Sequence, residues 1–155
     1  MLESELILQL RKFSREFDCI KSELFDETLD AYHQQLLFKQ RLLYVEQDGE
    51  LLGYVESWRI NYQQFGRKLC GEPVDIEKED IETGKICYIN NVTIRPDVRK
   101  GLTIKLLRNK FYLQNIDAEY VVGERNGKKH RPVKVFKMRD VLANKALNME
   151  DMIHG

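Results

Sequence analysis

The chain has 155 residues, of which 43% are hydrophobic and 32% are charged. This balance is typical of a globular domain and excludes a mainly disordered chain, which buries too little apolar surface to offset the entropy of ordering. Basic and acidic residues number 25 each, so the net charge excludes a general attraction to nucleic acid or to an anionic membrane.

A chain of this length can bury a hydrophobic core, and we expect one domain over residues 1–155. The cysteines Cys19, Cys70 and Cys87 show no CxxC spacing, which favours reduced thiols in a reducing compartment. The N-terminal residues lack the layout of a signal peptide, and no apolar stretch approaches the ~20 residues of a membrane-spanning helix. The scattered histidines predict no metal site. We therefore expect a cytoplasmic protein with neither a membrane nor a metal as partner.

The first part of the chain predicts two helices. Apolar residues recur at spacings of three and four over residues 2–20, which is the pattern of one buried helix face. A second helix is predicted to begin with Asp26 as its N-cap. Its inward-facing residues should be Leu29, Tyr32 and Leu36.

Two strands joined by a tight turn are predicted next. Residues 41–46 and 51–58 form two strand-like apolar runs, with Asp48 and Gly49 between them. An Asp-Gly pair in this position is a strong signal for a β-hairpin, because both residues tolerate the positive φ of a type I′ turn.

Residues 61–84 form a long connection that contains glycines, a proline and an acidic run at 75–82. A connection of this length in a compact domain is often a functional loop. A solvated surface insertion with a short helix is the favoured interpretation, and both remain open at this stage.

A βαβ unit is predicted in the second half of the chain. Residues 85–96 are apolar on both faces and end at a proline, as a central strand does. Asn90 and Asn91 interrupt this apolar run and indicate a β-bulge. A helix is predicted over 98–116, and a strand parallel to the first is predicted over 119–123.

The helix predicted over residues 98–116 carries apolar residues on two sides. We expect the sheet to cover one side and other helices to cover the second. The first side holds Leu102, Leu106, Leu113 and Ile116, and the opposite side holds Ile104, Leu107 and Phe111.

Residues 42–141 resemble the GNAT acyltransferase superfamily in the order hairpin, long strand, glycine-bearing turn, helix and strand. The text NVTIRPDVRKGLTIKLL at 91–107 is similar to the acyl-CoA motif of that family, in which a strand reaches a proline and a glycine-containing turn opens a helix. The resemblance implies an α/β fold of the α+β kind. It should be a GNAT-like mixed sheet with flanking helices, built from N-terminal helices, a β-hairpin and a βαβ unit, with a tail at 142–155.

The turn RKGLT at residues 99–103 is one residue shorter than the family's Arg/Gln-x-x-Gly-x-Gly/Ala pattern, and Thr103 stands where the family prefers a tiny residue. A helix N-terminus still offers unpaired amides and a partial positive charge to a pyrophosphate. The candidate donors for CoA are therefore Arg99, Lys100, Gly101, Leu102, Thr103 and Ile104.

The resemblance implies an N-acyltransferase that moves an acetyl group from acetyl-CoA, its co-substrate, to an amine acceptor by direct attack. In the family the thioester lies between two splayed parallel strands, which here would pass through Val92 and Val121. An amide of Val92, Thr93 or Ile94 would donate to the thioester carbonyl. The candidate general bases are Glu56, Tyr88 acting through a water, and Glu124.

The family's general acid is commonly a tyrosine, and Phe136 occupies the expected position without a hydroxyl. An alternative function therefore stays open, namely a catalytically degenerate GNAT-like module that contacts nucleic acid or a protein through the basic segment 125–139. Nucleic acid is the less favoured partner, because this segment lacks interleaved aromatic residues and a known nucleic-acid-binding signature. A homodimer is compatible with either function.

Overall fold

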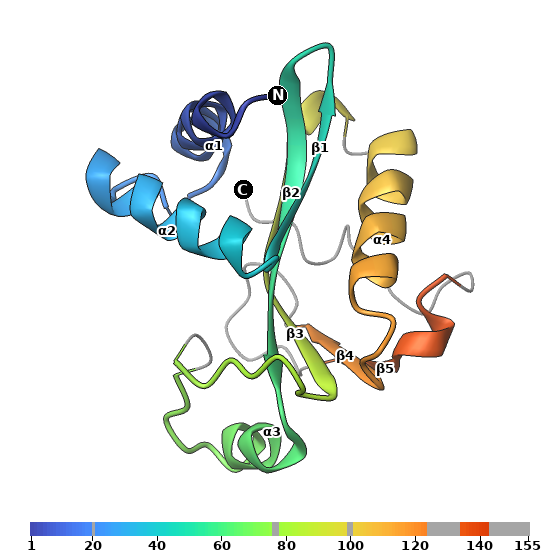
Figure 1. Ribbon diagram of the computed structural model, residues 1–155. Coiled ribbons are helices and arrows are strands. Elements are labelled where there is room, and N and C mark those ends of the chain that lie inside the picture. The colour runs from blue at the N-terminus through green and yellow to red at the C-terminus, as the bar shows by residue number, and fades with distance from the viewer. Residues whose placement is uncertain (20, 76–77, 99–100, 124–133, 143–155) are drawn as a thin grey trace.

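The computed structural model describes residues 1–19, 21–75, 78–98, 101–123 and 134–142. Figure 1 shows how these elements are arranged. Its helices, strands and 3-10 turns are, in chain order, α1 (Glu3–Phe17), α2 (Asp26–Phe38), β1 (Leu42–Gln47), β2 (Glu50–Ile60), α3 (Tyr62–Leu69), β3 (Ile86–Ile94), η1 (Pro96–Val98), α4 (Leu102–Gln114), β4 (Tyr120–Gly123), β5 (Lys134–Lys137) and η2 (Met138–Asp140).

The strands form one mixed five-stranded sheet in the order β1-β2-β3-β4-β5. The pairs β1–β2, β2–β3 and β4–β5 are antiparallel, and β3–β4 is parallel, so the predicted βαβ unit is confirmed. The helices α1 and α2 lie on one face of the sheet and α4 lies on the other (Figure 1). Each face therefore buries its own hydrophobic cluster.

The predicted hairpin is present as β1 and β2. Asp48 and Gly49 have φ values of 53° and 79°, the positive angles that a type I′ turn requires. Strand β2 runs through the middle of the molecule, and nearly all of its residues are buried.

The N-terminal helices pack their apolar faces against the hairpin. Leu10 of α1 and Leu36 of α2 are fully buried in a cluster with Trp58 of β2. The predicted N-cap of α2 is wrong by one position, because Phe25 is the N-cap and Asp26 is the first helical residue. The Asp26 carboxylate accepts a hydrogen bond from Arg15 Nη2 at 2.8 Å instead of capping the helix.

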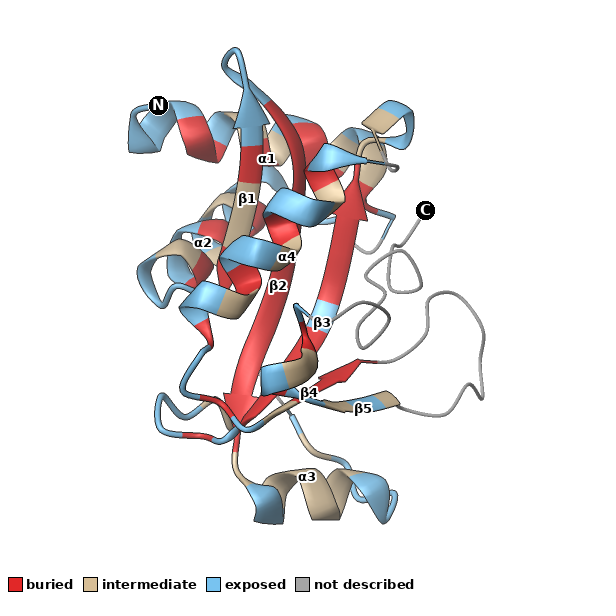
Figure 2. Cartoon of the chain, turned by 90° about the vertical axis from the view of Figure 1, so that its right-hand side faces the viewer, coloured by how far each residue is buried: buried red, intermediate tan, exposed pale blue. Residues whose placement is uncertain are grey.

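Helix α4 begins at Leu102, later than the sequence predicts, because Pro96–Val98 form a separate 3-10 turn. Gly101 at the N-cap has a φ of 99°, which no residue inside a right-handed helix adopts. The side of α4 that faces the sheet buries Leu107 and Phe111. The predicted cover of the opposite side is wrong for the part of the chain that the structure describes: Figure 2 shows that side exposed, and its exposed residues are Leu102, Leu106, Leu113 and Ile116.

The connection between β2 and β3 contains one short helix, α3, which has no buried residue. This agrees with the interpretation of 61–84 as a surface insertion. Asp80 links the connection 61–84 to the sheet. Its carboxylate accepts hydrogen bonds from Arg41 Nε at 2.9 Å and from the Arg59 amide at 2.7 Å.

The sequence patterns do not predict the strand β5. They place its residues only within the basic segment 125–139. The strand pairs only with β4, so it is an edge strand, and its flanking residues 124–133 lie outside the described part of the chain. Among the described helices, none has the length and apolar character to cross a membrane.

Candidate functional site

The predicted bulge in β3 is confirmed by the register of the sheet. Glu56 pairs with Asn91 and the next residue of β2 pairs with Ile89, so Asn90 has no partner across the strand. Asn90 is exposed although its neighbours on both sides are buried. An extra residue of this kind bends the strand and redirects the side chains beside it.

The parallel pairing of β3 with β4 is described as far as the bulge, because the residues that follow Gly123 lie outside the described part of the chain. The last pair is Ile89 with Gly123. Beyond it, residues 90–94 continue β3, and no described strand pairs with them on that side. This edge includes Val92, Thr93 and Ile94, the residues expected to donate an amide to a thioester carbonyl. The backbone groups of this edge are therefore left for a ligand or for a segment outside the described residues.

The start of α4 lies close to the end of β3. Ile94 of β3, Val98 of η1 and Ile104 of α4 pack in one hydrophobic cluster. No described side chain caps α4, so its first amides have no such partner. A Cβ atom added at Gly101 would meet no described atom within 4 Å beyond its chain neighbours.

The residues at the start of α4 differ in solvent exposure. Leu102 is largely exposed, Ile104 is half-buried and Thr103 is only 6% exposed. The buried Thr103 side chain leaves the backbone amides, rather than its hydroxyl, as the groups that face outward. Arg99 and Lys100, which the sequence adds to this site, lie outside the described residues.

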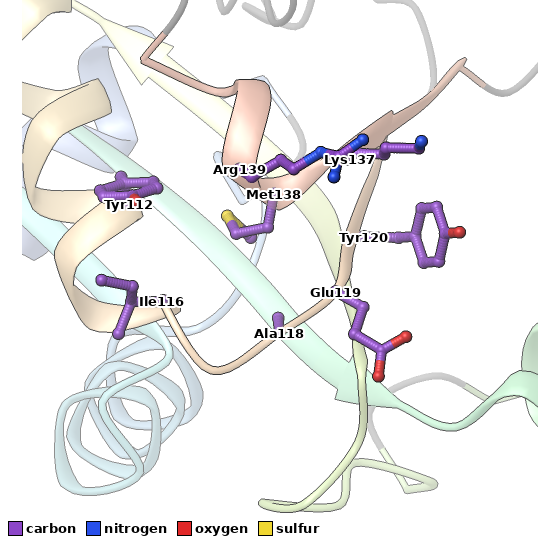
Figure 3. A pocket seen from close by; sticks show the side chains of 8 residues that line it. All are labelled: Tyr112, Ile116, Ala118, Glu119, Tyr120, Lys137, Met138 and Arg139. Carbon is purple, nitrogen blue, oxygen red and sulfur yellow. The ribbon is translucent and has the colours of Figure 1, made fainter.

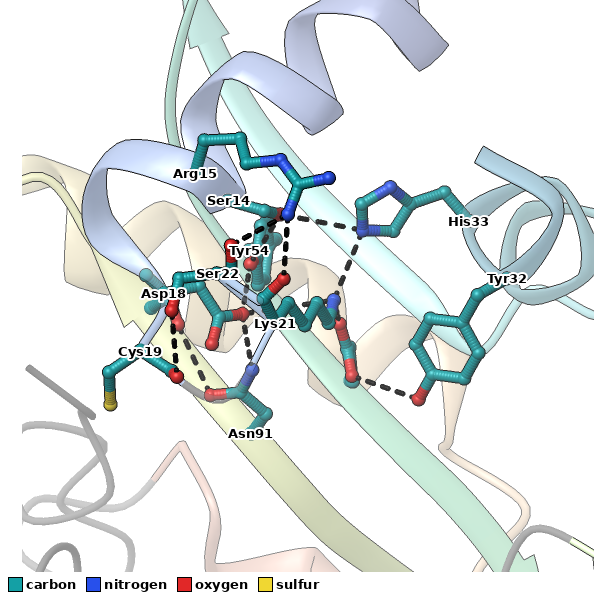
Figure 4. A network of polar contacts seen from close by, with 12 residues as sticks. Ser14, Arg15, Asp18, Cys19, Lys21, Ser22, Tyr32, His33, Tyr54 and Asn91 are labelled. Atoms are coloured by element: carbon teal, nitrogen blue, oxygen red, sulfur yellow. Dashed lines mark hydrogen bonds and ion pairs between the residues drawn. The ribbon is translucent and has the colours of Figure 1, made fainter. Parts of the chain in front are cut away.

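On the opposite face of the sheet, beneath α1 and α2, polar side chains gather in a buried group that we call the polar cluster (Figure 4). Its members are almost completely withdrawn from solvent. Hydrogen bonds and ion pairs join them into one network. The polar cluster consists of Ser14, Asp18, Lys21, His33, Tyr54, Glu56 and Asn91.

Of the predicted bases that the structure describes, Glu56 lies in the polar cluster. It is 1% exposed and forms an ion pair with Lys21. The hydroxyl of Tyr32 donates a hydrogen bond to Glu56 Oε2 at 3.3 Å. Glu56 also pairs with Asn91 across the sheet, directly beside the bulge. The structure thus brings this carboxylate next to the strand edge at which the thioester is expected.

Lys21 provides the cation of the polar cluster. Its Nζ lies 3.8 Å from Asp18 Oδ2 and 4.6 Å from the centre of the Tyr54 ring. Burial lowers the pKa of Lys21 to about 7, because desolvation outweighs the charge and the hydrogen bond of Asp18, which raise it.

His33 of α2 contacts Lys21 from the other side, with 3.1 Å between its Nε2 and Lys21 Nζ. Burial and the charge of Lys21 lower the pKa of His33 to about 3, so its imidazole is neutral at pH 7. An ammonium group can only donate, so Nε2 accepts and Nδ1 carries the proton. Among the described residues, Nδ1 has no hydrogen-bond partner.

Asp18 connects the end of α1 to the bulge in β3. Its Oδ2 accepts hydrogen bonds from the Tyr54 hydroxyl and from Asn91 Nδ2, the latter at 2.8 Å. Burial raises the pKa of Tyr54 well above its ordinary value, and the negative charge of Asp18 raises it further, so Tyr54 remains a donor. Thr93 Oγ1 donates to Asn91 Oδ1 at 3.1 Å. The Asn91 side chain is therefore fixed at both ends.

Tyr88, another predicted base, lies elsewhere. Tyr88 is buried in a separate cluster with Ile60 and Val122, and Lys68 Nζ lies 5.3 Å from the centre of its ring. Glu124 lies outside the described residues. Phe136 is on the edge strand β5 and pairs with Val121 of β4.

Sequence patterns missed most of the polar cluster, although some carried a signal. His33 follows Leu29 by four residues and precedes Leu36 by three, which places it on the buried face of α2. Ser14 has the same relation to Leu10 on α1. Lys21 lies in a polar connection between the helices, where no periodicity applies.

A hollow of about 360 Å³ lies at the other end of α4 (Figure 3). It opens between the last turn of α4, the start of β4 and the end of β5, so it is separate from the start of α4. Its residues are Tyr112, Ile116, Ala118, Glu119, Tyr120, Lys137, Met138 and Arg139. Lys137 and Arg139 belong to the basic segment 125–139, and none of the described residues predicted for catalysis or CoA binding lines this hollow.

No family model matches the sequence, and no curated protein matches it significantly. Solved structures do share its fold. One is the loading GNATL domain of CurA from Lyngbya majuscula, with 18% identity, a TM-score of 0.52 and coverage of 82% of this chain and 61% of that one. A second is the GphF GNAT-like decarboxylase in complex with isobutyryl-CoA, with 14% identity, a TM-score of 0.54 and coverage of 83% and 66%.

A third similar structure is a GNAT family acetyltransferase from Brucella melitensis in complex with acetyl-CoA. It is 13% identical, with a TM-score of 0.51, and the match covers 88% of this chain and 84% of that one. The present chain spans less than two thirds of the length of the first two structures. Together these matches confirm the expected GNAT-like fold.

Proposed function

We propose that this chain, which has the GNAT fold, is an N-acyltransferase that passes an acetyl group from acetyl-CoA to an amine acceptor. The observation that supports the proposal is the edge of β3 at residues 90–94, which follows a bulge and has no described strand beside it on the β4 side. The turn η1 then leads to the start of α4, which no described side chain caps. Two structures of the same fold hold CoA thioesters, acetyl-CoA in one and isobutyryl-CoA in the other.

In this proposal the start of α4 binds the pyrophosphate of CoA. The amides of Leu102, Thr103 and Ile104 belong to the first turn and point out of the helix N-terminus, where an anion is stabilised by the helix dipole. Gly101 lets the ligand approach the backbone closely. Arg99 and Lys100 would add positive charge at the same place.

The chemistry requires a donor for the thioester carbonyl and a base for the amine. An amide within Val92–Ile94 would stabilise the oxyanion, and the bound geometry would supply most of the rate by proximity. Glu56 is the base that the polar cluster favours, since it lies opposite the bulge, while Tyr88 through a water and Glu124 remain further candidates. Phe136 provides no acid, so CoA would leave as a thiolate and would then take a proton from water, because a thiol with a pKa of about 8.5 is mostly protonated near neutral pH.

The experiment is a calorimetric titration of acetyl-CoA, and of free CoA, into the purified chain and two variants. Gly101→Glu places a carboxylate against the pyrophosphate, and Gly101→Ala imposes the same strain at a φ of 99° without a charge. We expect binding to the wild type, a loss of at least about tenfold in affinity for Gly101→Glu, and a change of less than about threefold for Gly101→Ala.

One outcome would contradict this function, and a second would contradict the placement of its CoA site. A folded wild-type chain that binds neither ligand would move the assignment to a non-catalytic module that acts through the basic segment 125–139. Equal weakening by both variants would show that backbone strain, rather than the lost phosphate site, explains the effect.

A further inference from the structure

We propose that the outer face of α4 is a docking surface for an acidic amphipathic helix of another protein. We call this surface the α4 stripe, and it consists of Leu102, Leu106, Asn109, Leu113 and Ile116. The inference goes beyond the proposed acyl transfer and does not depend on it, because the stripe lies on the side of α4 that faces away from the sheet.

The α4 stripe exposes an unusual amount of apolar surface for one helix. The exposed fractions are 69% for Leu102, 40% for Leu106, 68% for Leu113 and 59% for Ile116. Figure 2 shows this side of α4 as exposed, while the opposite side packs on the sheet. A single exposed leucine is ordinary, but a row of large aliphatic side chains along one helix is typical of an interaction site.

The spacing of the α4 stripe is that of a coiled-coil seam. Its members follow one another at intervals of four, three, four and three residues, the spacing of the a and d positions of a heptad. Asn109 is exposed at the centre of the row, and one asparagine in such a seam specifies the register of the partner helix. A helix that lies on a membrane surface instead presents a broad apolar face with aromatic residues. The narrow stripe therefore fits a second helix better than a membrane.

The charges beside the α4 stripe select an acidic partner. Lys105 and Lys110 are exposed at the positions that flank a heptad seam on its two sides. Lys110 Nζ donates a hydrogen bond to the Tyr44 carbonyl at 2.7 Å, which holds this cation beside the stripe. Arg108 adds a third cation, and α4 contains no acidic residue. Glutamates beside the seam of a partner helix would match these charges, whereas a second copy of α4 would place cations against cations.

The surface continues beyond the end of α4. Ile116 also lines the hollow that Figure 3 shows, so the apolar stripe leads into it. Lys137 and Arg139 line the same hollow and bring two further cations to this end of the stripe. The acidic side chain in its lining, Glu119, accepts a hydrogen bond from the Tyr62 hydroxyl. The hollow therefore extends the docking surface with the same combination of apolar and cationic groups.

The test measures the binding of two labelled synthetic peptides to the full chain by fluorescence anisotropy. Both peptides have about 21 residues with leucine at every a and d position, and they differ only in carrying glutamate or lysine at the flanking positions. We expect the glutamate peptide to bind at least about tenfold more tightly than the lysine peptide. Raising the NaCl concentration from about 50 mM to about 500 mM should weaken the binding of the glutamate peptide at least about threefold.

Two variants locate the binding on the α4 stripe. Leu113→Gln removes an apolar contact at the seam and should weaken the binding of the glutamate peptide at least about tenfold. Leu69→Gln is the matched control, because Leu69 is 60% exposed on a different helix, α3, and this variant should bind like the wild type. The urea midpoint of Leu113→Gln should equal that of the wild type, since the replaced side chain is exposed.

Several results would overturn the inference. Equal affinity for the two peptides, or no binding of the glutamate peptide, would exclude an acidic helix. A dimer in sedimentation that Leu113→Gln dissociates would assign the α4 stripe to a second copy, and binding to phosphatidylglycerol vesicles that the same variant abolishes would assign it to a membrane surface. A lower urea midpoint for Leu113→Gln would show that the chain covers the stripe itself. No CoA thioester enters these measurements, so their outcome is independent of the proposed function.

Discussion

Burial and charge oppose each other at the residues of the polar cluster. Lys21 and His33 both lose much of their affinity for protons inside the fold, because water no longer solvates their charged forms. Asp18 and Glu56 remain in contact with Lys21, and these contacts favour the charged form of its amine. The protonation of Lys21 therefore depends on the balance between burial and these two carboxylates.

Protonation of His33 should link stability to pH. The pKa of His33 is about 3 in the folded chain and 6.5 in its ordinary state, so the unfolded chain binds more protons between these values. Stability is thus fully retained above pH 6.5 and falls as the pH drops toward 3. From about pH 7 to about pH 5 the loss from His33 alone should be about 2 kcal/mol.

Urea unfolding of the wild type and of His33→Gln at these two pH values checks this prediction. Glutamine does not titrate, so the variant should lose less stability on acidification. The difference between the two chains separates the contribution of His33 to the pH dependence from that of the carboxylates. An identical pH dependence in both chains would show that His33 stays neutral for another reason, or titrates at its ordinary pKa.

At the scale of elements, the site depends on where β3 and α4 begin and end. Asn90 and Asn91 mark the bulge in the sequence because two polar residues break an apolar strand. The start of α4 was predicted too early, because Val98 fits the apolar pattern of the helix that follows. Gly101 decides the boundary through its positive φ, and a helix that began earlier would have no open N-terminus at that point.

The capping of α3 offers a test at this scale. Asn61 Oδ1 accepts a hydrogen bond from the Gln64 amide, and Gln64 Oε1 accepts one from the Asn61 amide, both at 2.8 Å. Asn61→Ala removes half of this capping box and should lower the free energy of opening α3 by about 1 kcal/mol.

Hydrogen exchange of the α3 amides measures this change directly. Gln63→Ala lies on an exposed position of the same helix and leaves the capping box intact, so it is the matched control. Faster exchange in both variants by the same amount would mean that the capping box contributes nothing to the helix.

At the scale of the whole molecule, Arg59 joins three segments that are distant in sequence. Its Nε donates to the Gly84 carbonyl at 2.8 Å, at the end of the connection that follows β2. Its two terminal nitrogens contact both oxygens of Asp117 at 3.1 and 2.9 Å, between α4 and β4. Such a bidentate pair holds the βαβ unit against the hairpin.

Arg59→Met should lower the free energy of unfolding by about 2 kcal/mol, because it leaves a buried carbonyl without its donor and removes the link to Asp117. Arg67→Met is the control, since Arg67 pairs with Glu72 at the same 2.9 Å but at the surface. It should cost less than about 1 kcal/mol. The fluorescence of the single tryptophan, the buried Trp58, reports unfolding. Equal losses in the two variants would refute the special role of Arg59.

By itself, the sequence determined the elements whose signals are local. The hairpin follows from Asp48 and Gly49, the bulge from Asn90 and Asn91, and the order of strand, turn and helix from periodicity and a proline. The resemblance to an acyl-CoA motif also depends on neighbouring residues, so it could be seen in a single stretch of text. All of these depend on backbone preferences over a few residues, which the sequence expresses directly.

Only the tertiary structure decided how side chains from distant segments meet. Lys21, Glu56 and Asn91 come from a helix connection and two strands, and no pattern in the text relates them. Burial, which sets the protonation of Lys21 and His33, is a property of the packed molecule. The edge strand β5 and the exposed side of α4 were likewise decided by pairing and coverage, which depend on what the rest of the chain leaves open.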